Sequence, residues 1–294
     1  MAPSAFLASS SATLELQRRL LPSGLDDPER DSAMTIWSSG LTQPSPPVLL
    51  NAMCQGSWDA SVVAELVDSI SNQIQDPYHL ARWKAALDPR SGDWLKAMPI
   101  SAIGLRLDDE AVRIAVGIRL GSNLCSPHPC VCGELVDARG THGLACRRNR
   151  GRLSRHSSLN DIVHRFLVKA GFPAVKEPVG LLRTDLKRPD GCSLIPWQNG
   201  KCVAWDVTAP DTLARSYLPD TSLVSAAAAE SASRKKSTKY VDISRSHLFV
   251  PIAVESLGPS NKEGVDFLCT LANALLTRRE TLERRISCFD VFLL

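Results

Sequence analysis

Residues 188–207 read RPDGCSLIPWQNGKCVAWDV and have the pattern of a β-hairpin. Runs rich in apolar residues flank the Gln-Asn-Gly segment at 198–200, and an Asn-Gly pair between such runs is a strong signal for a tight turn. Asp190 comes directly before the first run, and Asp206 lies near the end of the second. These two ends are neighbours in an antiparallel hairpin, so the pattern places the two carboxylates side by side.

Two neighbouring carboxylates are candidates for a metal site. Their charges repel, and one of them takes up a proton unless a cation lies between them. Magnesium suits such a pair, because it binds a few carboxylates together with water and phosphate oxygens. It can also polarise a phosphodiester and activate a water for in-line attack. The simpler interpretation is that Asp190 and Asp206 are solvated residues at strand ends.

The chain around the hairpin predicts a mixed α/β sheet flanked by helices. Gly and Pro end one helical segment, an alanine-rich stretch favours a later helix, and short apolar runs fit strands. The predicted order is helix 157–170, strands 174–179, 191–197 and 202–207, helix 222–240, a strand from 247, and helix 262–285. This order defines a small α/β domain.

The part of the chain before this unit is expected to be mainly helical. Apolar residues recur at helical spacing within 59–90, and Asp108 and Asp109 suit the first turn of a further helix. A short helix is predicted at 12–21, and the Pro- and Ser-rich stretch 38–48 is typical of a linker. We expect three regions, a helical connector, a helix with a cysteine-rich segment, and the α/β domain, at 1–98, 99–152 and 153–294.

Four of the nine cysteines lie within one short segment that is also rich in Gly, Pro and His. Such a cluster in an intracellular protein suggests a metal site more than disulfides. Three thiolates and one imidazole suit tetrahedral zinc, which would supply much of the folding energy of so small a knot. The candidate ligands are Cys130, Cys132, His142 and Cys146, with Cys125 and His128 as substitutes. The alternative is a group of buried, reduced cysteines.

The net charge of +3 is small, but the positive charges are concentrated. Segments 147–156 and 233–247 are basic, and the first holds five arginines and no acid. Such patches suit phosphate binding, although many are only solvated surfaces. No apolar run approaches the ~20 residues of a membrane span, and the start lacks the pattern of a secretory signal. We expect an intracellular protein without a membrane partner.

The RPD segment at 188–190, with Asp206 after the hairpin, resembles the core of PD-(D/E)XK nucleases. The resemblance implies a restriction-endonuclease-like core with its acids on adjacent strands of a helix-strand-strand-strand-helix-strand unit. A lysine normally follows the second acid by two positions, where this chain has Thr208. In one branch of the family the lysine lies on the following helix, which here offers Lys236 and Lys239 on one helical face.

Upstream segments make the resemblance more specific. The stretch PCVCGELVDARGTHGLAC at 129–146 and RHSSLN at 155–160 precede the RPD segment. This succession is similar to the carboxy-terminal region of non-LTR retrotransposon proteins that carry a zinc knuckle and a restriction-like endonuclease, and the similarity covers about 124–240 well. In that family the region follows a reverse transcriptase, whose aromatic-x-Asp-Asp motif this sequence lacks. The chain therefore resembles an amino-truncated element or a domesticated remnant.

The resemblance implies a magnesium-dependent DNA endonuclease whose nick primes reverse transcription by a polymerase supplied in trans. The implied catalytic residues are Asp190, Asp206, Lys236 and Lys239, with one of the two lysines acting. Magnesium would be held by Asp190 and Asp206 with help from Asp161 or Glu177. Contacts to DNA, and to element RNA, are expected from Arg147, Arg148, Arg150, Arg155, His156, Asn160 and Arg188. The arginine cluster also suits a nuclear localisation signal.

Two alternatives to an active nuclease remain open at this point. The first is a zinc-dependent nucleic-acid-binding remnant whose nuclease core has decayed, and Thr208 in the lysine position is the feature that favours it. The second is a transposon relic without function. The retained acids, the RPD segment and the Lys-Tyr segment at 239–240 count against the first, and the motif region shows no obvious decay that would favour the second.

Overall fold

The computed structural model describes residues 55–103, 105–181 and 187–278. The helix predicted at 12–21, the linker at 38–48 and the last part of the helix predicted at 262–285 lie outside these residues.

The chain forms two compact units that divide after residue 73. Helix α4 (Gln55–Gln73) is the described part of the first unit. Helix α5 (Pro77–Leu87) belongs to the second, where its buried alanines pack against Leu213 and Leu257. The predicted connector region is therefore divided between the two units.

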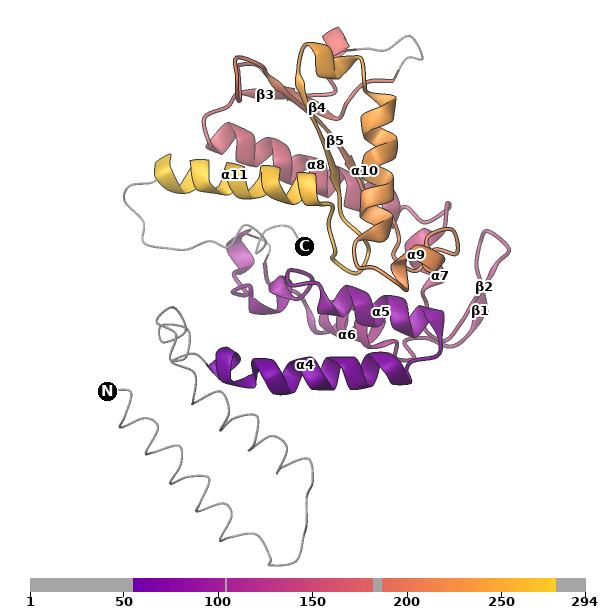
Figure 1. The fold of residues 1–294 in the computed structure, drawn as a ribbon. Coiled ribbons are helices and arrows are strands. Elements are labelled where there is room, and N and C mark those ends of the chain that lie inside the picture. Colours follow the sequence, from indigo (N-terminus) through magenta and orange to yellow (C-terminus); the bar gives the residue numbers. More distant parts are fainter. Residues whose placement is uncertain (1–54, 104, 182–186, 279–294) are drawn as a thin grey trace, which may run out of the picture. The chain divides into compact units, whose positions relative to one another are not determined.

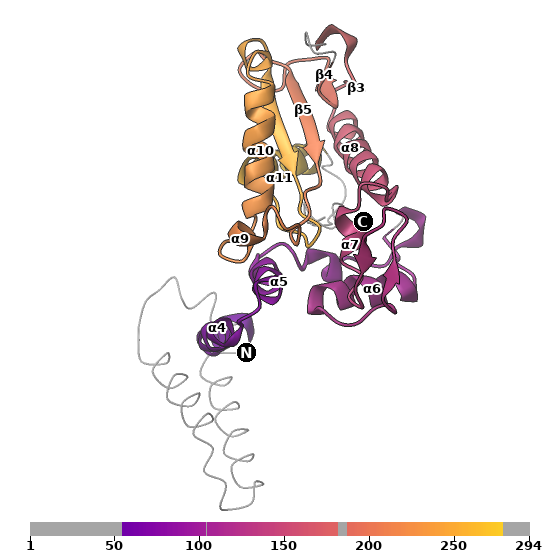
Figure 2. The same cartoon turned by 90° about the vertical axis from the view of Figure 1, so that its right-hand side faces the viewer.

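A four-stranded mixed sheet, covered by helices on both faces, forms the centre of the second unit (Figure 1). The strand order is β3-β4-β5-β6, in which the first two pairs are antiparallel and the last pair is parallel. Helices α8 and α11 lie on one face and α10 on the other (Figure 2). The bounds are β3 Ala174–Lys176, β4 Gly191–Ser193, β5 Val203–Thr208, β6 Leu248–Ala253, α8 Gly151–Lys169, α10 Ala227–Lys239 and α11 Lys262–Arg278. The predicted mixed α/β class is confirmed.

Strand β5 lies inside the sheet and is buried on both faces. Val203, Trp205 and Val207 pack with apolar residues of α8 and α11. Successive side chains of a strand point to opposite faces, so Ala204 and Asp206 face the side that α10 covers. Buried alanines let α10 approach this face closely. The alternation therefore carries a carboxylate into the space between the sheet and α10.

The hairpin turn forms where the sequence predicts it. Asn199 and Gly200 have φ angles of 51° and 72°, and the N–H of Lys201 donates to the carbonyl of Gln198 at 2.9 Å. Two consecutive positive φ angles are typical of the two-residue turns that match the strand twist. Asparagine and glycine adopt positive φ angles with less steric strain than other residues do.

Strand β4 is shorter than predicted, because it ends at Ser193 and not at Trp197. The Ser193 hydroxyl accepts the N–H of Val203 at 3.0 Å and donates to the carbonyl of Ile195 at 2.8 Å. The Ser193 side chain thereby replaces a backbone group as the hydrogen-bond partner of the opposite strand. The backbone pairing does not resume at Pro196, because proline has no N–H. Trp197 then packs edge-on against a core phenylalanine.

Helix boundaries also differ from the prediction at two places. Helix α8 begins at Gly151, six residues early, where the Asn149 side chain accepts the N–H of Gly151 at 2.9 Å. The helix predicted at 222–240 begins only at Ala227, because Ala226 has a φ of 62° that no right-handed helix allows. Helix α9 (Leu218–Thr221) precedes this residue and α10 follows it.

Similar local causes shape the flanking elements. Strand β3 stops before Glu177, which has a φ of 49°. Helix α6 (Asp109–Leu120) begins after Asp108, whose carboxylate accepts the N–H of Ala111 at 2.7 Å. The short elements are β1 His128–Pro129, β2 Leu135–Val136, α7 His142–Ala145, η1 Asp93–Lys96, η2 Ser101–Ile103, η3 Val179–Leu181 and η4 Ile243–Arg245. Among the residues that the structure describes, no helix has the length and apolar character needed to cross a membrane.

Candidate functional site

The four predicted zinc ligands come together as one cluster. The ligand atoms of Cys130, Cys132, His142 and Cys146 all lie within 4.8 Å of one another. Cys130 Sγ is 3.7 Å from Cys146 Sγ, and Cys132 Sγ is 3.1 Å from His142 Nε2. Cys125 is not part of the cluster, and its Sγ lies 3.4 Å from the carbonyl oxygen of Asp137. Three sulfurs and one imidazole nitrogen can hold a metal ion such as zinc.

Local structure explains how the cluster forms. The antiparallel pair β1–β2 closes through a turn in which Gly133, with a φ of 94°, donates its N–H to the carbonyl of Cys130 at 2.8 Å. Hydrogen bonds from Cys132 lower the pKa of the Cys130 thiol, which favours the thiolate that a metal needs. Helix α7 supplies His142, and Cys146 follows at its end.

Polar side chains attach this knuckle to helix α8. Arg155 Nη2 donates to the carbonyl of Leu144 at 2.7 Å, and Asn149 Nδ2 donates to that of Gly143 at 2.6 Å. Burial lowers the pKa of the Arg155 guanidinium. Arg155, predicted to contact DNA, therefore points toward the knuckle and joins it to α8.

The hairpin brings Asp190, directly before β4, beside Asp206 of β5. Gly191 pairs with Trp205, which sets the two aspartates opposite one another at the next position. The N–H of Val207 donates to Asp190 Oδ2 at 2.6 Å. The Asp206 side chain is only 3% exposed. Two carboxylates, one half-buried and one buried, thus lie at one end of the β4–β5 pair.

A lysine from the following helix contacts this acid pair. Lys236 of α10 forms an ion pair with Asp206 Oδ1. Thr208, two residues after Asp206, lies at the end of β5 opposite Ala253. Lys239 is different, because its Nζ lies 2.7 Å from the Tyr240 hydroxyl and above that ring. Of the two candidate lysines, the structure brings Lys236 to the acids.

His156 is the second basic group at the acid pair. Its Nε2 lies 3.1 Å from Asp190 Oδ2. This hydrogen bond raises the pKa of His156. The Asp190 carboxylate therefore has two donors, one from the backbone of β5 and one from α8.

The two acids suggested as further magnesium ligands pair with other residues. Asp161 forms an ion pair with Lys176, and Glu177 forms one with Arg188. Within the described residues, the Cys-Cys-His-Cys cluster is the only group of three or more His, Cys, Asp or Glu side chains that lie closely enough to share a metal ion. The structure thus brings together two of the four proposed magnesium ligands.

Asn160 and Tyr240 contact the acid pair from inside the protein. Asn160 is buried, accepts the Trp205 indole N–H at 2.8 Å and donates to the Asp190 carbonyl at 3.4 Å. Tyr240, which is 1% exposed, donates its hydroxyl to the carbonyl of Arg188 at 2.8 Å. Asn160 was predicted to contact DNA, and its burial instead gives it a packing role. The role of Tyr240 follows from tertiary contacts that sequence spacing alone does not predict.

The arginines around the start of α8 are exposed: Arg147, Arg148 and Arg150 precede the helix, and Arg152 lies in its first turn. Arg148 donates Nη1 to the Val131 carbonyl at 2.8 Å, which adds a further link between the segment and the knuckle.

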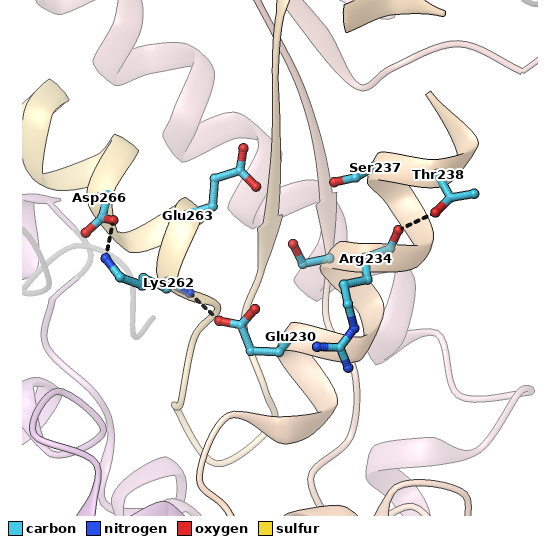
Figure 3. A pocket seen from close by; sticks show the side chains of 8 residues that line it. Glu230, Arg234, Ser237, Thr238, Lys262, Glu263 and Asp266 are labelled. Atoms are coloured by element: carbon cyan, nitrogen blue, oxygen red, sulfur yellow. Dashed lines mark hydrogen bonds and ion pairs between the residues drawn. The ribbon is translucent and has the colours of Figure 1, made fainter. Parts of the chain in front are cut away.

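Two hollows lie apart from the acid pair. One, of about 570 Å³, lies between α10 and α11 and is lined by charged and hydroxyl side chains (Figure 3). There Glu230 accepts the Lys262 backbone N–H at 2.6 Å, and the Lys262 amine pairs with Asp266 at 2.9 Å. The other, of about 600 Å³, is lined mainly by apolar residues of α6, α8 and the segment after β6. One buried carboxylate in its wall, Glu255, has an Oε2 without a hydrogen-bond partner among the described residues.

No model of a known protein family matches the chain, and no curated protein has a significant match to it. Evidence on function therefore comes from the two sites described above. These are the Cys-Cys-His-Cys cluster and the acid pair with Lys236 and His156.

Proposed function

We propose that the chain is a magnesium-dependent DNA endonuclease with an adjoining zinc knuckle. One observation carries the proposal, namely that Asp190, directly before β4, lies opposite Asp206 of β5, which Lys236 of α10 contacts. Apart from the short helix α9, the element order α8-β3-β4-β5-α10-β6 supports it, because it is the order that the resemblance to PD-(D/E)XK nucleases implies. The knuckle before α8 agrees with the branch found in non-LTR retrotransposon proteins.

The donor set at the acid pair suits magnesium. Asp190 and Asp206 offer carboxylate oxygens at one end of the β4–β5 pair, and hard cations prefer such ligands. Lys236 and, when it is protonated, His156 offset their negative charges. When bound, magnesium would supply Lewis acidity toward the phosphodiester and an activated water.

Protein residues would orient the metal-binding carboxylates and stabilise the charge of the transition state. The Asp190 carboxylate is oriented by the N–H of Val207 and by His156, so its position is set before substrate binds. The Lys236 ammonium would offset the negative charge that builds on the phosphate in the transition state. Asn160 and Tyr240 would keep the backbone around Asp190 in place through its own carbonyl and that of Arg188.

The partner and setting follow from the same resemblance. DNA would be the substrate, element RNA a further ligand, and a reverse transcriptase acting in trans would extend the nicked strand. Exposed arginines beside the knuckle are suited to phosphate contacts and to nuclear import.

Nicking of supercoiled plasmid tests this function. The purified zinc-loaded chain should nick with added magnesium and not without it, and Asp190→Ala should bind DNA but fail to nick. Added chelator is avoided, because it would also remove zinc. Nicking by Asp190→Ala at the wild-type rate would contradict the assignment.

A second candidate is a nucleic-acid-binding protein whose nuclease core no longer cuts. The Lys236–Asp206 ion pair favours it, because the pair satisfies the buried carboxylate without any metal. Magnesium-dependent thermal stability distinguishes the two functions. A rise in melting temperature that Asp190→Ala abolishes supports the nuclease, and the absence of any rise, with DNA binding intact, supports the binding protein.

A further inference from the structure

We propose that the cleaved DNA strand runs past the amino-terminal turns of α8, on the side that carries His156, with Arg152 contacting a phosphate one or two nucleotides from the cut. This inference rests on the proposed nuclease function and identifies the surface that its substrate uses. Arg152 belongs to the basic segment 147–156, and the inference gives this one residue a defined position on the substrate.

Helical geometry places Arg152 beside the acid pair. Arg152 and His156 are four residues apart on α8. Such residues lie within about 40° of one another around the helix and about 6 Å apart along it. His156 contacts Asp190, so Arg152 lies one turn from the acid pair toward the knuckle.

Arg152 also has its positive charge available for a ligand. Its side chain is exposed, and it forms no ion pair with any residue in the described ranges. Burial raises the pKa of Asp211, which follows β5, and the positive charges of Arg155 and Arg152 counter that rise. Arg155, three residues later, instead donates to Leu144 and holds the knuckle. The two arginines therefore differ in role, although the sequence presents them alike.

The spacing matches a nucleic-acid backbone. One strand of a duplex carries a phosphate charge every ~3.4 Å along the axis, so ~6 Å corresponds to about two phosphates. A scissile phosphate at Asp190 and Asp206 would then place the first or second neighbouring phosphate at Arg152. The exposed side chains of Arg150 and Arg147 would continue the contact toward the knuckle.

Helix α8 offers a matched control on its other side. Arg165 is nine residues from His156, which is about 180° around the helix. It is exposed, and its Nε donates to the Asp161 backbone carbonyl at 3.3 Å. Arg165→Ala removes the same charge from the same helix on the side that the proposal excludes.

The first measurement is the salt dependence of binding to a nicked-site duplex without magnesium. Arg152→Ala should reduce the magnitude of the slope of log affinity against log salt concentration by the amount expected for one phosphate contact, about one. Arg165→Ala should leave the slope unchanged. Equal slopes for wild type and Arg152→Ala would overturn the proposal. Binding can be measured whether or not the chain cuts, so a failed nuclease would not hide this result.

The second measurement locates the contact on the strand. A neutral methylphosphonate is placed at single positions around the mapped nick, and binding is compared between wild type and Arg152→Ala. The penalty should disappear in Arg152→Ala only at the first or second phosphate from the cut. If the penalty disappeared in Arg152→Ala only at phosphates farther from the cut, the proposed path of the strand would be contradicted, while the nuclease function would stay intact.

Discussion

Lys236 of α10 forms an ion pair with Asp206 of β5, thirty residues earlier in the chain. The alternation of β5 turns Asp206 toward α10, and the buried alanines of α10 allow close approach. A lysine on this helix can therefore reach the acid that a lysine at position 208 would serve. Under the proposed nuclease function, Lys236 would act in place of a lysine at position 208, where this chain has threonine.

Removing Lys236 should destabilise the protein when magnesium is absent. Lys236→Met leaves the Asp206 carboxylate buried without its partner, and the expected loss is about 1–3 kcal/mol of unfolding free energy. This is below the cost for a fully buried pair, because the lysine side chain is 26% exposed. Urea unfolding measures the loss. The double variant Lys236→Met with Asp206→Asn should recover most of it, and additive losses would contradict a direct interaction.

Glu255 should make stability depend on pH. Burial raises the pKa of this carboxyl above its ordinary 4.5. Because the folded-state pKa is the higher one, its favourable contribution is complete below about 4.5 and is lost as the pH rises through the raised value. Glu255→Gln should therefore gain stability relative to wild type as the pH rises above 4.5. Unfolding free energies measured over that range test this, and parallel curves would refute it.

The cysteine cluster should bind one zinc ion per chain. Cys132→Ser removes a ligand and should abolish zinc binding, as measured by native mass spectrometry. The control Cys125→Ser changes a cysteine outside the cluster and should retain the metal. Zinc loss should also loosen the start of α8, which the knuckle holds through Arg155. Equal zinc content in the two variants would argue against these ligands.

Asn160 should matter for stability and not for DNA phosphate contact. Asn160→Ala leaves the buried Trp205 indole N–H without an acceptor, at a cost of about 1–3 kcal/mol. Asp161→Ala, at the next and more exposed position, should cost less. Chemical denaturation gives both values. A changed salt slope of DNA binding in the stable fraction of Asn160→Ala would instead favour the direct contact that the sequence suggested.

Sequence patterns predicted the elements whose signals are local. The Asn199-Gly200 turn could be predicted because its residues tolerate positive φ, and that turn sets Asp190 opposite Asp206. The zinc ligands could be proposed from residue type and spacing, although the choice between Cys125 and its neighbours required the fold.

Features that depend on tertiary packing could not be predicted in this way. Lys236 and Lys239 lie on the same helical face and are equal candidates by sequence. Only the packing of α10 against β5 shows that Lys236 contacts Asp206, whereas Lys239 contacts Tyr240. Asn160 is polar and was assigned to DNA, whereas its partner Trp205 lies 45 residues away. The early end of β4 results from a hydrogen bond between the Ser193 side chain and the opposite strand, and the pattern of apolar residues does not predict such a bond.

The measurement that tests the central claim most directly is single-turnover plasmid nicking by Lys236→Ala, compared with Lys235→Ala. Lys235 is the adjacent exposed lysine of α10, and its Nζ lies 3.3 Å from the Tyr217 hydroxyl, away from the acids. The account predicts that Lys236→Ala lowers the magnesium-dependent rate by about 10²–10³, while Lys235→Ala stays near wild type. Equal rates for the two variants would contradict the proposed site.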